Sequence, residues 1–172
     1  MKNLLIGAVL GAGLCFLLIS ATTYLLVLSG LLPARQDEAA SDLERWMAGI
    51  SLKATIKREA QRKSPLTADG QNLLAGAKLY AGYCSGCHGA PLNPMPSFAT
   101  AYSPAAPLFL EDSPKNDDEK EIYWKIEHGI RFTGMPSFKK MLSEKEIWQL
   151  SLFLKNLEKL PPTVQAYWQT VK

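Results

Sequence analysis

The hydrophobic positions of this chain form one long unbroken run, followed by several shorter periodic segments. No charged side chain occurs from Asn3 to Ala34, and the stretch from Leu4 to Leu32 is almost wholly apolar. A helix needs about 20 apolar residues to cross a bilayer, whereas the hydrophobic region of a secretory signal runs to roughly 7–15. Residues 1–34 are therefore predicted to be a transmembrane anchor rather than a cleaved signal.

An amphipathic helix is predicted next, within a linker of residues 35–64. From Ser41 to about Lys63, apolar residues recur at helical spacing, and the second half of the segment is basic. The apolar positions are Leu43, Trp46, Met47, Ile50 and Ala54. We expect this stripe to pack on the following domain, and the basic half leaves open a contact with anionic membrane lipid.

Residues 65–161 are predicted to form one helical domain. Ser64-Pro65 ends the preceding helix because the residue before a proline is pushed out of the α region. Helical periodicity and capping signals then predict three helices: one from Thr67 or Asp69 to about Tyr83, one from Asp117 to His128, and one that starts with the capping box Ser143–Glu146 and runs toward Pro161. No alternating strand pattern occurs, so the fold class is all-α, and residues 162–172 are read as a C-terminal tail.

A proline-rich stretch separates the first two of these helices. Residues 89–114 contain six prolines and little periodicity. A structureless segment of about 25 residues is uncommon in a compact domain and normally serves a purpose, such as wrapping a ligand. We therefore expect a bound prosthetic group.

The charge balance excludes one class of partner. The net charge is +3, and residues 65–172 hold equal numbers of acidic and basic side chains. A nucleic-acid binder would carry a clustered basic face. We expect no nucleic-acid partner.

The most informative segment is Cys84-Ser85-Gly86-Cys87-His88. C-x-x-C-H is the attachment signature of c-type haem: two thiols add to the haem vinyl groups, and the adjacent imidazole binds the iron. The alternatives are a redox disulfide, which needs a βαβ setting, and a zinc site, which needs four ligands. Only His128 and Cys15 remain to complete such a zinc site, so haem is the favoured interpretation.

The second axial ligand of the iron is assigned to Met135. It lies in a loop between Gly134 and Pro136, far enough from His88 for the chain to reach the other haem face. A thioether favours ferrous iron and raises the potential relative to bis-histidine ligation. Met95, Met141 and His128 are weaker candidates, because Met95 is too close in sequence and the other two lie at helix ends.

Residues from about Leu66 to Leu160 resemble a class I cytochrome c. The resemblance lies in GAKLYAGYCSGCHG, the proline-rich loop, WKIEHGIRFTGMPSF and the final helix EIWQLSLFLKNL. It implies three to five helices around one covalent haem c, with Cys84 and Cys87 attaching the haem and His88 and Met135 binding the iron. The segments before residue 66 resemble those of membrane-bound bacterial members.

The resemblance also implies roles for residues away from the ligands. The first and last helices would cross at Gly76, Tyr80 and Phe153, and the carbonyl of Pro107 is the best match for the group that accepts a hydrogen bond from the proximal histidine. We further consider Trp124 and Arg131 as neighbours of the haem propionates. Core packing is the favoured role for Trp124, and Arg131 is equally compatible with a plain surface position.

These observations predict an electron carrier rather than an enzyme, because an iron with both axial positions filled has no open site for substrate. The protein would pass electrons between membrane-bound complexes of a respiratory or photosynthetic chain, such as a quinol-oxidising complex, a terminal oxidase or a dehydrogenase. The alternative is a fixed haem subunit of a larger oxidoreductase complex, and a haem-based gas or redox sensor is less favoured. We expect the N-terminus inside a bacterial cytoplasmic membrane and the haem domain on its periplasmic side. Gly7 and Gly11 are spaced for pairing with another transmembrane helix.

Overall fold

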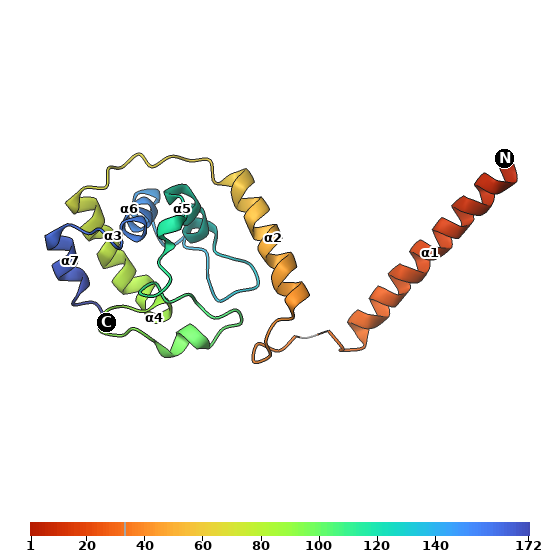
Figure 1. Ribbon diagram of the computed structural model, residues 1–172, viewed down its shortest axis with the longest axis horizontal. Coiled ribbons are helices and arrows are strands. Elements are labelled where there is room, and N and C mark those ends of the chain that lie inside the picture. Colours follow the sequence, from red (N-terminus) through yellow and green to blue (C-terminus); the bar gives the residue numbers. More distant parts are fainter. Residues whose placement is uncertain (33) are drawn as a thin grey trace. The chain divides into compact units, whose positions relative to one another are not determined.

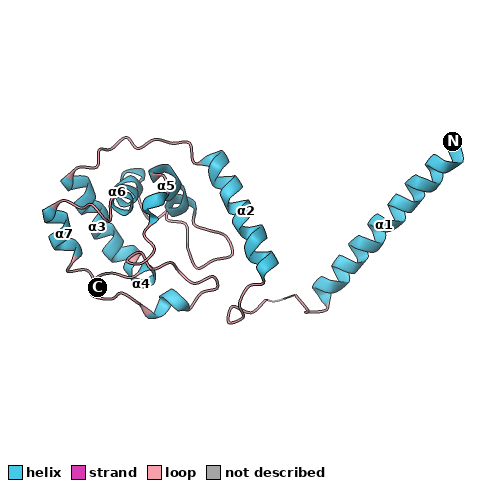
Figure 2. Ribbon diagram, viewed as in Figure 1, coloured by secondary structure: helices cyan, strands magenta, loops and turns pink. Residues whose placement is uncertain are grey.

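The chain divides into two compact units, Met1–Glu38 and Ala39–Lys172. The computed structural model describes residues 1–32 and 34–172, so Pro33, within the predicted anchor, lies outside the described residues. Helices and loops make up the described part, without a strand (Figure 2). The predicted all-α fold class is confirmed.

The first unit is built on a single helix, α1 (Lys2–Leu28). None of its residues is buried, and its most apolar window has a mean hydropathy of 2.5. The helix is therefore long and apolar enough to cross a membrane, as the sequence predicts. Gly7 and Gly11 both face open space, so a neighbouring helix would have room to approach them.

The second unit contains six α-helices among the described residues (Figure 1). They are α2 (Asp42–Glu59), α3 (Gly70–Tyr83), α4 (Ser85–His88), α5 (Glu119–His128), α6 (Glu144–Lys155) and α7 (Pro162–Trp168), with short 3-10 helices η1 (Ser97–Thr100) and η2 (Pro114–Asn116). Side chains of Ser41, Asp69 and Ser143 cap α2, α3 and α6 by accepting backbone N–H bonds. Such caps satisfy donors that the first turn of a helix leaves unpaired.

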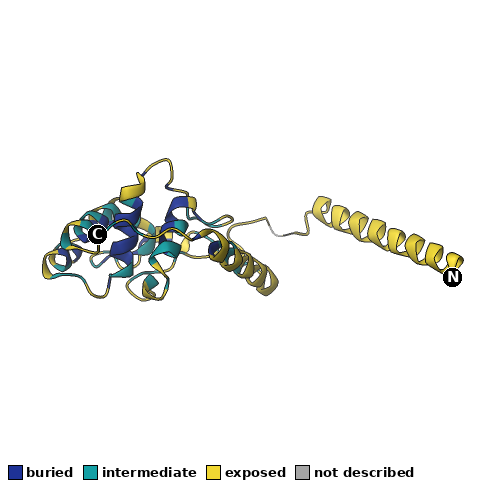
Figure 3. Cartoon of the chain, turned by 90° about the horizontal axis from the view of Figure 1, so that it is seen from above, coloured by how far each residue is buried: buried dark blue, intermediate teal, exposed yellow. Residues whose placement is uncertain are grey.

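The core lies where α3 crosses α6, with α5 and α7 packed around that crossing. Figure 3 shows that buried residues lie in the helices of the second unit. Tyr80, Trp148 and Phe153 are fully buried, and the Tyr80 ring centroid lies 5.7 Å from that of Phe153. A Cβ on Gly76 would lie 2.1 Å from the backbone oxygen of Gln149 and 2.7 Å from Cβ of Phe153. The two helices can approach this closely only because position 76 has no side chain.

Replacing Gly76 with alanine is expected to destabilise the domain by about 3 kcal/mol or more, because the clash involves backbone atoms of α6 that cannot move aside. Denaturant unfolding of the purified protein measures this. Gly82→Ala on the same helix is the matched control, since a Cβ there meets nothing within 4 Å. The control should be neutral or stabilising by up to about 1 kcal/mol, and an equal loss in both variants would contradict the crossing.

The sequence predicts only a C-terminal tail over residues 162–172, and the structure places α7 there. Val164, Trp168 and Val171 are buried, and the Trp168 ring packs edge-on against Tyr80 with centroids 5.3 Å apart. The backbone N–H of Leu92 also donates to the oxygen of Val171. The C-terminal segment is therefore part of the core.

The expectation that the apolar stripe of α2 packs on the domain is wrong. Leu43, Trp46, Met47 and Ile50 are 51–63% exposed, and Ala54 is exposed as well. Ile56, in the last turn of α2, is buried instead. The stripe thus lies on the outer side of α2, and the helix contacts the domain through a different side.

Candidate functional site

The two thiols of the C-x-x-C-H segment lie where α3 ends and α4 begins. Cys84 is both the C-cap of α3 and the N-cap of α4, and its carbonyl accepts from the N–H groups of Cys87 and His88. Burial raises the pKa of the Cys84 thiol to about 12, with the neighbouring Cys87 adding to the effect. The hydroxyl of Tyr80 donates to the oxygen of Gly89 at 2.6 Å, which holds the end of α4 against α3.

Gly89 ends the C-x-x-C-H turn in a conformation that favours glycine. Its φ is +78°, and a Cβ there would lie 2.7 Å from the carbonyl oxygen of Pro94. The chain can therefore turn sharply away from His88 into the proline-rich loop.

The ring of His88 is fixed on two sides by that loop. Its Nδ1 lies 2.9 Å from the carbonyl oxygen of Pro107, and its ring stacks on Phe109 with centroids 4.2 Å apart and an interplanar angle of 10°. A carbonyl can only accept, so Nδ1 carries the proton and Nε2 keeps its lone pair. Burial lowers the pKa of His88, which favours the neutral, metal-binding form of the imidazole. The match proposed for Pro107 is confirmed by this contact.

Met135 is held by a short loop after α5. Its N–H donates to Oγ1 of Thr133, whose hydroxyl donates to the oxygen of Ile130, and the N–H of Ile130 donates back to the oxygen of Met135. Gly134 lies against the ring of Tyr102, where a Cβ would come within 2.5 Å of a ring carbon. These contacts fix the backbone on both sides of the thioether.

Cys84, Cys87, His88 and Met135 line one cavity of about 570 Å³. Small-molecule and cofactor sites typically enclose roughly 300–1,000 Å³. Much of the wall is apolar, with Leu52, Phe109, Ile122, Ile126, Phe138 and Leu154 among its members. Nine of the lining residues, all between positions 102 and 114, belong to the proline-rich loop, which fits the expectation that this loop wraps a bound group.

One edge of the cavity is polar. The ammonium of Lys125 pairs there with Asp117 at 2.5 Å, and the buried hydroxyl oxygen of Ser113 has no hydrogen-bond partner among the described residues. A buried polar atom without a partner is uncommon in native proteins and often marks the place of a bound polar group. Sequence analysis named neither Lys125 nor Ser113, because nothing in their local pattern separates them from ordinary surface residues.

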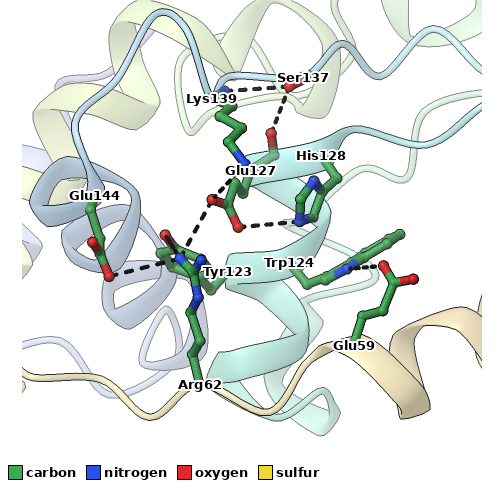
Figure 4. A network of polar contacts seen from close by, with 9 residues as sticks. All are labelled: Glu59, Arg62, Tyr123, Trp124, Glu127, His128, Ser137, Lys139 and Glu144. Carbon is green, nitrogen blue, oxygen red and sulfur yellow. Dashed lines mark hydrogen bonds and ion pairs between the residues drawn. The ribbon is translucent and has the colours of Figure 1, made fainter.

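Three residues that the sequence brought into consideration lie outside the cavity lining. Trp124 is half-buried and donates through Nε1 to Glu59 at 3.1 Å, while His128 pairs with Glu127 at 3.2 Å (Figure 4). Arg131 is exposed. Trp124 therefore lies outside the core, contrary to the expectation. The propionate contacts considered for Trp124 and Arg131 stay predictions, and Arg131 lies at the surface. His128 is not placed to bind an iron in this cavity.

Met95 and Met141, the alternative methionine ligands, are not placed to bind an iron in this cavity either. Met95 is 64% exposed and Met141 is 57% exposed, and neither lines the cavity. Two thiols, an imidazole with a free Nε2 and one thioether are the donor set that a covalently attached haem with His/Met ligation needs. The residues present thus fit a haem c.

The fold and this donor set define the class of the domain as a c-type cytochrome. Residues 71–154 match the family model described as cytochrome C oxidase, cbb3-type, subunit III, which is a model of a cytochrome c domain. Comparisons with curated proteins and with solved structures gave no match. This match implies a haem c and a role in electron transfer, as an electron carrier or as a subunit of an oxidase complex.

Proposed function

We propose that this protein is a membrane-tethered monohaem cytochrome that passes single electrons between redox complexes of one membrane. The observation that carries the proposal is the convergence of Cys84, Cys87, His88 and Met135 on one cavity. Among the described residues, Cys84, Cys87 and His88 belong to the only C-x-x-C-H segment, and Met135 is the only methionine that lines the cavity. A single haem is therefore expected.

Each of the four residues has a separate role in this proposal. The Cys84 and Cys87 sulfurs would attach the haem, and Nε2 of His88 and the sulfur of Met135 would bind its iron. The haem would supply an iron that can alternate between ferrous and ferric states. Pro107 and Phe109 keep the His88 ring in one orientation and one tautomer, so the ligand needs no rearrangement when the charge of the site changes.

The polar edge of the cavity is proposed to hold the haem carboxylates. Lys125 brings a positive charge to this edge, and the unpartnered Ser113 hydroxyl can donate a hydrogen bond. The apolar remainder of the wall excludes water from the ring. A dry environment limits solvent reorganisation when an electron arrives or leaves.

The membrane topology follows from where c-type haem is attached. Attachment takes place outside the cytoplasm, so residues 35–172 are proposed to lie on the periplasmic side, with Lys2 inside. This orientation agrees with the positive-inside tendency, although Lys2 is the only basic residue before Arg35. The apolar α1 then restricts the haem domain to the region next to the bilayer.

An exposed aromatic residue marks a candidate contact for the redox partner. Phe132 is 89% exposed and adopts a φ of +60°, a backbone conformation that is unfavourable for a bulky side chain. It directly precedes the loop of Thr133, Gly134 and Met135, which lines the cavity. Strained residues tend to persist where function requires them, so Phe132 is proposed to contact the electron donor or acceptor.

The family description favours a second candidate function, that of a fixed haem subunit in a larger oxidase complex. Gentle solubilisation followed by native electrophoresis separates the two candidates. A shuttle should migrate alone or in variable amounts with other proteins, whereas a subunit should co-migrate at fixed stoichiometry.

Spectroscopy of the purified protein tests whether His88 and Met135 occupy both protein ligand positions of the iron. The reduced-minus-oxidised spectrum should show a c-type haem, and carbon monoxide should leave the reduced spectrum unchanged, because Met135 occupies the position that the gas needs. Ready binding of carbon monoxide would contradict an electron carrier with His/Met ligation and favour a sensor.

A further inference from the structure

The helix α2 has two apolar sides that point in opposite directions. An α-helix turns about 100° per residue, so Leu52 lies two and a half turns after Leu43, on the opposite side. Leu52 lines the cavity, and Ile56 on the same side is buried. The other side carries Leu43, Trp46, Met47 and Ile50, which all remain more than half exposed.

Contacts at the C-terminal end of α2 fix which side faces outward. Glu59 accepts a hydrogen bond from the Trp124 indole at 3.1 Å (Figure 4). Arg62, just after the helix, donates to the hydroxyl of Tyr123 at 3.1 Å and pairs with the buried Glu127 at 3.5 Å. Because α5 holds α2 at these points, the outer apolar side is a defined surface of the domain.

The outer side changes from apolar to basic along its length. After Ile50 and Ala54, the same side continues into Lys57 and Arg58, and Lys53 lies at its margin. A helix that lies in a membrane interface places apolar and aromatic residues at the acyl boundary and basic residues near phosphate groups. This sequence of side chains fits an anionic lipid surface.

The link to α1 keeps α2 close to such a surface. Only residues 29–41 separate the end of α1 from the start of α2. Thirteen residues span at most about 45 Å even when fully extended. If α1 crosses the membrane, α2 cannot move far from the headgroups.

We propose that the outer side of α2 lies in the lipid interface of the membrane that α1 crosses, with Lys57 and Arg58 against anionic headgroups. The inference rests on α1 spanning the bilayer and is independent of haem attachment. A second copy of the chain fits less well, because an apolar seam confined to Leu43–Ile50 is shorter than the three or four heptads that sustain a coiled coil.

A lipid-bound α2 would orient the haem domain. Leu52, on the inner side of the same helix, forms part of the cavity wall. The cavity would therefore be held at a fixed height and tilt above the bilayer instead of rotating freely on its tether. A fixed orientation presents the same face to partners embedded in that membrane.

Spin labels on the full-length haem protein test the proposal. Met47→Cys and Ile50→Cys are made in a Cys15→Ser background, labelled with a nitroxide and reconstituted into phosphatidylethanolamine and phosphatidylglycerol vesicles. Each label is measured with and without the relaxing agent, so that the constant contribution of the haem iron cancels. Labels at 47 and 50 should be relaxed more strongly by oxygen, which concentrates in lipid, than by a water-soluble nickel chelate.

Ala48→Cys provides the matched control, because Ala48 is exposed on a different side of the same helix. Its label should show the opposite preference, for the nickel chelate. Equal aqueous exposure at positions 47, 48 and 50 would overturn the proposal. Spectral broadening that disappears on dilution with unlabelled protein would assign the surface to a second copy, and immobilisation only in the presence of another membrane protein would assign it to that partner; both results overturn the lipid assignment.

A charge variant gives an independent check. Trp46→Glu should make the label at position 50 several-fold more accessible to the nickel chelate, while Ala48→Glu should leave it unchanged. The haem spectrum should be the same in both, which separates loss of membrane contact from loss of the fold. An unchanged label in Trp46→Glu would count against the proposal.

Discussion

Replacing Met135 with alanine is expected to open the iron to external ligands and to lower its reduction potential by on the order of 0.1 V or more. The thioether favours ferrous iron, so its removal stabilises the ferric state. The variant should also lose the weak sulfur-to-iron absorption in the red and should bind carbon monoxide when reduced. Potentiometric titration followed by visible spectroscopy measures all three changes.

Met141→Ala is the control for this experiment. Met141 is 57% exposed and lies outside the cavity lining, so its removal should leave the potential and the red absorption unchanged. Met135→His supplies a second comparison, because an imidazole can refill the axial position without restoring the sulfur absorption. If the absorption survives in Met135→Ala, another residue is the ligand and the assignment is wrong.

Removing both attachment thiols, in Cys84→Ala/Cys87→Ala, is expected to abolish stable folding of the second unit. The cavity measures about 570 Å³. Without the haem, the apolar wall of this cavity would lose its packing partner, and a core cavity that stays dry costs about 24 cal/mol for each Å³. Water that enters the cavity reduces this cost, but contact between water and the apolar wall is itself unfavourable. The core around Tyr80 and Phe153 should therefore lose its fixed packing.

Haem staining after denaturing electrophoresis measures the covalently attached haem. Near-ultraviolet circular dichroism measures the fixed packing of the aromatic core. Cys15→Ser is the matched control, since Cys15 is exposed on α1. It should keep both the stain and the folded signal. A double variant that folds as stably as the parent would show that the cavity does not depend on a covalently held group.

The elements with local signals were predictable from the sequence. Asp69 and Ser143 mark the starts of α3 and α6, and Gly129 follows the last residue of α5 with a φ of +68°. These signals act within one helical turn, so no knowledge of the tertiary structure is needed to read them. The C-x-x-C-H segment is equally local, and it placed the candidate site at the end of α3.

The helix α7 and the orientation of α2 depend on contacts between residues far apart in the sequence, and they were less predictable. Pro161-Pro162 was read as the end of structure, but proline is also favoured in the first turn of a helix, and α7 begins at Pro162. The spacing of Val164, Trp168 and Val171 was the signal for a buried helical face. For α2, periodicity identified an apolar stripe, but only the contacts made by Glu59 and Arg62 determine which side faces the domain.

The polar surroundings of the site also depend on tertiary structure. Trp124 and Arg131 were considered for the propionates, yet the Trp124 indole donates to Glu59. Lys125, one residue further along α5, lines the cavity instead. Successive helical residues point about 100° apart, so a shift of one position changes which side chain faces the cavity.

Mass spectrometry of the denatured full-length protein is the most direct test of covalent haem attachment. After acid extraction, the polypeptide should retain the added mass of one haem, and digestion should place that mass on the peptide containing Cys84 and Cys87. A protein that releases all its pigment on extraction, or that shows the bare polypeptide mass, would contradict the assignment of this domain as a haem c carrier.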